Sequence, residues 1–95
     1  MPAYVIAEVE VTDPVAFADY AKAGPAVLTA HGGTYVARGG VIESLEGDWT
    51  PKRLTIIRFD NVAQAKAWFE SDDYRPLRRI RRRSATSKIL VIEGV

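Results

Sequence analysis

The sequence contains no cysteine and a single histidine, His31. Disulfides, thiolate nucleophiles and iron–sulfur clusters are therefore excluded, and so is a zinc site built from the Cys and His side chains of one chain. Phosphate-binding, dinucleotide-binding, zinc-protease and serine-hydrolase motifs of the types GxxxxGK[ST], GxGxxG, HExxH and GxSxG do not occur either. We therefore expect neither a metal nor another cofactor.

Long hydrophobic runs are also lacking. No apolar stretch approaches the ~20 residues that a membrane-spanning helix needs, and the first residues do not form a basic and then apolar secretory signal. The composition, 47% hydrophobic and 26% charged, is that of an ordinary globular domain without low-complexity tracts. We expect one domain over residues 1–95, located in the cytoplasm and without membrane contact.

Hydrophobic periodicity predicts alternating strands and helices. Residues 3–11 alternate with a period of two, and Thr12-Asp13-Pro14 is a typical helix start. Pro25 lies inside the first predicted helix, where a kink or break is expected. The predicted strands are 3–11, 34–38 with a broken continuation at 41–45, 53–59 and 87–93; the predicted helices are 14–31, one beginning at 62, and a short arginine-rich one ending near 83.

This order is the α+β, ferredoxin-like βαββαβ arrangement with an extra short helix before the last strand. Its two main helices cover one face of a four-stranded antiparallel sheet, and the wholly apolar face of strand 3–11 must be buried. We expect the opposite face to expose an apolar patch, which marks an interface and favours a homodimer packed sheet face on sheet face. The residues assigned to this patch are Ile6, Val36, Thr55, Ile57, Phe59, Ile89 and Val91.

Five segments together carry a family resemblance: VTDPVAFADY at 11–20, HGGTYVARGG at 31–40, LEGDWTPKRLTIIRFD at 45–60, AKAWFESDDYRPLR at 65–78 and ILVIEGV at 89–95. They resemble the domain-of-unknown-function 1330 family. The resemblance covers nearly the whole chain and implies the dimeric α+β barrel superfamily, with a face-to-face dimer and a pocket between sheet and helices. That superfamily includes metal-free monooxygenases, haem-degrading enzymes and lactone isomerases, so the resemblance implies no defined reaction.

Four residues are the primary candidates for a ligand site: Tyr20, Arg38, Tyr74 and Arg78. Tyrosines supply polar groups to an apolar pocket, and arginine binds anionic groups. Arg38 is expected on the open face of the sheet, the face proposed to lie inside the dimer barrel, together with Glu8 and Glu93. There it could bind an anionic ligand, or it could form a structural ion pair with a carboxylate. The aromatic pair Trp68 and Phe69 is expected to pack in the core.

Secondary candidates are His31, Glu46, Trp49 and Arg53. His31 could move a proton, but a histidine in the last helical turn more often complements the helix dipole. Glu46, Trp49 and neighbouring Arg53 could form an acid–base site or could simply order a turn.

The sequence therefore favours binding of, or metal-free action on, a small anionic or carbonyl-bearing organic molecule. The alternative is a non-enzymatic interaction module, because six arginines fall within the nine positions of Arg75–Arg83. Such a segment could dock an acidic partner or nucleic acid. Nucleic acid is not expected, because the third strand, RLTIIRF, lacks the aromatic platform of RNA-recognition modules.

Overall fold

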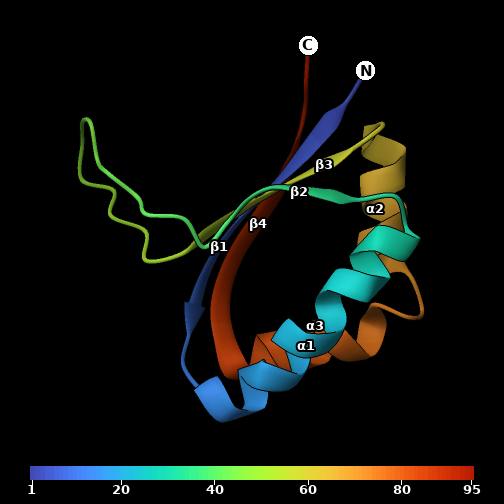
Figure 1. Cartoon of the computed structure of the whole chain (residues 1–95), viewed down its shortest axis with the longest axis horizontal. Coiled ribbons are helices and arrows are strands. Elements are labelled where there is room, and N and C mark those ends of the chain that lie inside the picture. Colours follow the sequence, from blue (N-terminus) through green and yellow to red (C-terminus); the bar gives the residue numbers. More distant parts are fainter.

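Seven elements follow one another in the computed structural model, which describes residues 1–95 (Figure 1). The chain runs through β1 (Ala3–Val11), α1 (Pro14–Ala30), β2 (Thr34–Arg38), β3 (Leu54–Phe59), α2 (Val62–Glu70), α3 (Arg75–Ser84) and β4 (Ala85–Glu93). The strands form one antiparallel sheet in the order β2-β3-β1-β4, and the helices lie on one side of it. The predicted α+β ferredoxin-like fold is confirmed, including the short helix before the last strand.

Helix α1 begins and ends where its local sequence predicts. The side chain of Asp13 accepts a hydrogen bond from the backbone N–H of Ala16, and Pro14 occupies the first turn. After the helix, Gly32 adopts a positive φ of 82°, a conformation that glycine adopts without strain. The expected break at Pro25 does not occur, since α1 continues through this residue to Ala30. None of the three helices combines the length and the apolarity needed to cross a bilayer.

The core lies between the sheet and the helices. Val5 on β1 pairs with Ile57 on β3 and with Val91 on β4, so these three side chains share the face that the helices cover. Ile57 and Phe59 are buried there. The sequence assignment of Thr55, Ile57, Phe59, Ile89 and Val91 to the open face was therefore wrong. Both faces of β3 and β4 are apolar, so a period of two could not identify the covered one.

The open face of the sheet carries a different set of aliphatic side chains. Ile6 pairs with Ile56 on one side and with Leu90 on the other, which places these three in a row across β3, β1 and β4. Leu90 and Ile92 are exposed to 57% and 54%. An apolar open face is thus present, as expected, but of the predicted residues only Ile6 and Val36 belong to it.

Residues 39–53 form a long irregular arm that extends away from the sheet (Figure 1). The predicted extended run at 41–45 is not a strand, and nearly all of the arm is exposed, including Val41 and Leu45. Within the arm, Trp49 Nε1 donates a hydrogen bond of 2.7 Å to Glu8 Oε2. The two chain termini lie side by side at the far end of the sheet, where the Gly94 N–H donates to the Pro2 carbonyl oxygen at 2.7 Å.

Candidate functional site

A cavity lies between the covered face of the sheet and the helices. Its volume is about 50 Å³, and 12 of its 18 lining residues are hydrophobic. This volume is enough for a few water molecules but is below the roughly 300 Å³ of an ordinary small-molecule pocket, so an organic ligand requires some side chains to move aside. The polar and aromatic groups of the lining come from every layer of the fold: Phe17, Tyr20, Tyr35, Arg38, Arg53, Thr55, Trp68, Tyr74 and Arg81.

Two phenol groups meet in this lining. Tyr20 on α1 and Tyr74, just before α3, have hydroxyl oxygens 2.7 Å apart, and either can be the donor. Whichever hydroxyl donates, the other keeps a proton that it can offer to a ligand. Burial, together with the neighbouring Tyr74 hydroxyl, raises the pKa of Tyr20 far above its ordinary value, so its hydroxyl stays protonated at neutral pH. Burial also raises the pKa of Tyr35.

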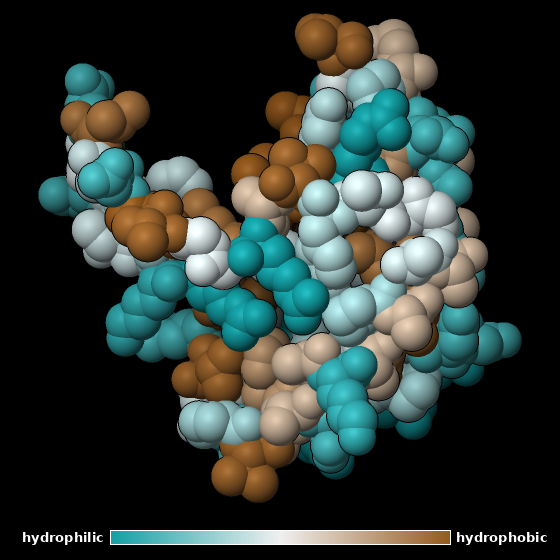
Figure 2. Space-filling model, viewed as in Figure 1, coloured by the Kyte–Doolittle hydropathy of each residue, from teal (hydrophilic) through white to brown (hydrophobic).

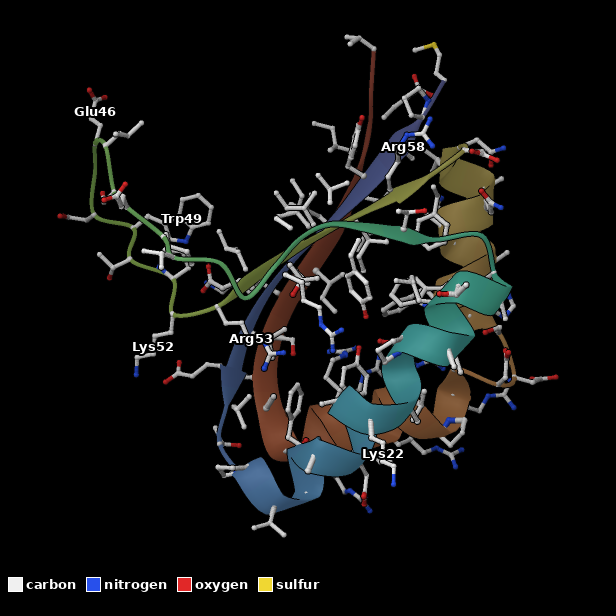
Figure 3. The ribbon with its side chains drawn as sticks, in the orientation of Figure 1. Lys22, Glu46, Trp49, Lys52, Arg53 and Arg58 are labelled. Carbon is white, nitrogen blue, oxygen red and sulfur yellow. The ribbon has the colours of Figure 1, made fainter.

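Three arginines line the same cavity, and each lies over an aromatic ring. The Cζ atoms of Arg38, Arg53 and Arg81 are 4.7, 5.3 and 6.0 Å from the ring centroids of Tyr35, Phe17 and Phe69. None of the three forms an ion pair, and none of the lining residues is acidic. Figure 3 shows Arg53 at the base of the arm, in the space between the sheet and α1. The cavity therefore concentrates positive charge that no carboxylate neutralises.

The family model described as Domain of unknown function (DUF1330) matches residues 2–95. The chain belongs to the DUF1330 family. No curated protein matches it. This DUF1330 chain is similar in structure to RPA0582 of Rhodopseudomonas palustris, a protein of unknown function, with a TM-score of 0.77 and 20% identity; the match covers 99% of this chain and 82% of that one.

Two further solved structures share the fold of the DUF1330 chain. SnoaB of Streptomyces nogalater, a cofactor-independent oxygenase, gives a TM-score of 0.71 with 14% identity and coverage of 99% of this chain and 93% of that one. A putative antibiotic biosynthesis monooxygenase from Bordetella bronchiseptica gives 0.59 with 22% identity and coverage of 99% and 97%. At these identities the likeness establishes the fold and not the reaction.

Three of the four primary candidates come together at the cavity. Tyr20, Arg38 and Tyr74 line it, but Arg78 does not. Arg78 instead donates from Nη1 to the Phe69 carbonyl oxygen, which ties α3 to the end of α2. Arg38 reaches the cavity because a β-bulge between Tyr35 and Ala37 shifts the register of β2. This bulge corrects the expectation that Arg38 shares the open face with Val36.

The main residue that the sequence reasoning missed is Arg81. Its side chain is only 4% exposed, although it belongs to the run of arginines that was interpreted as one surface segment. The signal was present, because Leu77, Arg81 and Ser84 are spaced as one face of a helix and all three are buried. Of the other arginines, Arg75 pairs with Asp72 at 2.9 Å. Arg79, Arg82 and Arg83 are exposed.

The secondary candidates lie in three separate places. His31 Nε2 is 2.9 and 3.0 Å from the two carboxylate oxygens of Asp73, and this hydrogen bond lowers the pKa of Asp73. Glu46 and Trp49 belong to the arm, outside the cavity (Figure 3). Only Arg53 lines the cavity. No three His, Asp or Glu side chains come together in an arrangement that could hold a metal ion.

Proposed function

We propose that this DUF1330 protein binds, or acts without a metal on, a small anionic or carbonyl-bearing organic molecule in the cavity between sheet and helices. The observation that supports this proposal is the set of polar groups that line the cavity. Three guanidinium groups and a phenol pair surround an aromatic space that contains no acidic side chain. Guanidinium and phenol groups donate hydrogen bonds to oxyanions and to carbonyl oxygens, which are the groups that this lining suits.

The structural neighbours are compatible with this proposal. SnoaB, which shares the fold, is a cofactor-independent oxygenase. A chain with the same architecture can thus act as an oxygenase without a resident cofactor. At 14% identity this is an analogy of fold, so it supports the proposal without specifying a reaction.

Native mass spectrometry of the protein purified from its own host tests the proposal. We expect a retained small molecule in the wild type and its loss in Arg38→Ala, because the exposed Arg38 side chain can be removed without opening the core. Arg58→Ala is the matched control. Arg58 lies on the open face, where it pairs with Asp60 at 3.4 Å, so its removal should leave retention unchanged. Equal retention by all three proteins, or no small molecule in any of them, would count against this function.

We further propose that the open face of the sheet packs on a second copy of the same chain. Ile6, Ile56 and Leu90 form a continuous aliphatic row, and exposed Ile92 extends it along β4. Hydrophobic side chains also face the gap between the arm and the body (Figure 2). A second copy offers an apolar face of the same shape, and two-fold packing covers both faces at once.

A further inference from the structure

Arg81 is a buried cation without a partner. Its side chain is 4% exposed, its Nε is buried with no hydrogen-bond acceptor, and no ion pair to it is formed. Buried arginines are normally neutralised by a carboxylate, because an uncompensated charge inside a protein is costly. The interaction with the Phe69 ring, at 6.0 Å, compensates only part of this cost. An anion that enters the cavity from solvent would compensate the remainder of this cost.

One other side chain of the cavity lining has a buried polar atom without a hydrogen-bond partner, and this atom is also a donor. Trp68 Nε1 is buried without an acceptor, and Trp68 lines the cavity together with Arg81. An indole N–H and a guanidinium N–H can only donate hydrogen bonds. Tyr20 and Tyr74 together retain one further hydroxyl proton. A ligand that satisfies these groups must therefore be rich in acceptors.

The lining also lacks a group that accepts a proton at neutral pH. It contains no carboxylate and no imidazole, and the one histidine of the chain is bonded to Asp73 outside the cavity. A neutral acid or enol would consequently find no general base here to ionise it. A ligand that is already ionised in solution needs no general base in the cavity.

We infer that Arg81 is the counter-ion of a buried oxyanion site, and that the ligand is a small carboxylate or an equivalent pre-ionised oxygen acid and not a neutral carbonyl compound. This inference rests on the proposed function and narrows its ligand class. Arg38 immediately precedes the arm, Arg53 is its last residue, and both are more exposed than Arg81. Their charges attract an anion to the cavity, whereas the desolvated charge of Arg81 holds it.

The first test compares anions with neutral molecules of the same shape. Acetate and benzoate are titrated into the wild-type protein beside acetamide and benzamide, and the Nε–H resonance of Arg81 is followed by NMR. We expect saturable shifts with at least one of the anions and binding weaker by about tenfold or more for its amide, because charge-assisted hydrogen bonds are lost. Amides that bind as well as the anions would overturn the oxyanion inference and leave the cavity function standing. If none of the four bound, both proposals would fail.

The second test removes the charge and keeps the side-chain volume. In Arg81→Met we expect anion binding to be lost and the Tm to rise, since an unpaired buried charge disappears. Arg79→Met, at an exposed position of the same helix, is the control and should change neither quantity. Arg81→Lys keeps the positive charge and should retain weakened binding. A destabilised or unfolded Arg81→Met protein would show that the guanidinium has a structural role instead. An Arg81→Met protein that still binds the anion would show that Arg81 is not its counter-ion.

Discussion

The hydrogen bond between Tyr20 and Tyr74 is the residue-scale feature on which the cavity depends. It spans 2.7 Å and joins side chains 54 positions apart, one on α1 and the other at the start of α3. Tyr74 is almost fully buried, at 1% exposure, and its ring centroid lies 4.5 Å from that of Trp68. The pair thus fixes the distance between two helices and at the same time presents a hydroxyl to the cavity.

Removing the Tyr20 hydroxyl should change stability in a pH-dependent way. Tyr20→Phe is expected to lower the free energy of unfolding at pH 7 by ~0.5–1.5 kcal/mol, the usual net value of one hydrogen bond. The folded-state pKa of Tyr20 is raised, so above pH ~10 the unfolded chain ionises first and wild-type stability falls. Urea unfolding between pH 7 and 11 should show a shallower alkaline decline in Tyr20→Phe. An identical decline in both proteins would mean that Tyr20 does not carry the effect.

The sequence identified those residues of the candidate site whose burial is usual for their residue type. Tyr20 and Tyr74 were identified because tyrosines on apolar helix faces combine burial with a polar group. Arg81 was missed because arginine is assigned to the surface by default, and five other arginines surround it in the sequence. The position of Arg38 depended on a β-bulge, which the local residue pattern does not specify.

At the scale of elements, α1 forms one wall of the cavity through a glycine followed by a proline. Gly24 is buried, and Gly24 and Pro25 both line the cavity. A side chain at position 24 would therefore point into the space that a ligand needs. The small residue keeps the cavity open at a cost in helix stability.

Gly24→Ala should accordingly stabilise the fold and weaken ligand binding. A Cβ at this position would have its nearest neighbour, Tyr20 Cε1, at 4.0 Å, an ordinary contact. We expect the free energy of unfolding to rise by about 0.5–1 kcal/mol, because alanine loses less backbone entropy than glycine. Urea denaturation measures this gain. Ala23→Gly, at the exposed neighbouring position, should lower stability by a similar amount without affecting binding. A loss of stability in Gly24→Ala would contradict this account.

The sequence predicted where helices begin more accurately than it predicted which face of the sheet a strand residue lies on. Asp13 and Asn61 are N-caps in the structure because their side chains accept backbone hydrogen bonds, a local property that a sequence displays. The face on which Ile57 lies depends on its pairing with Val5, which is a contact between distant segments. The segment 41–45 likewise looked extended, but the structure gives it no neighbouring strand to pair with.

At the scale of the whole molecule, the exposed aliphatic row predicts self-association. Leu90→Lys places a charge in the middle of the proposed interface, so the protein should become monomeric and its Tm should no longer rise with protein concentration. Light scattering coupled to size-exclusion chromatography gives the mass directly. Ala67→Lys, on an exposed position of α2, adds the same charge away from the face and should leave the dimer intact. A wild-type protein that is monomeric at high concentration would refute the interface.

The place of β1 at the centre of the sheet has a consequence for how the chain folds during translation. β1 precedes the other three strands in the chain, yet its partners are β3 and β4, and β4 begins at Ala85. Because translation adds ~5–20 residues per second, several seconds pass between the synthesis of β1 and that of β4, the strand that completes the sheet. Folding through such distant pairing is slow compared with that of a helical protein. In the interval, the apolar face of this strand is uncovered and open to non-native contacts.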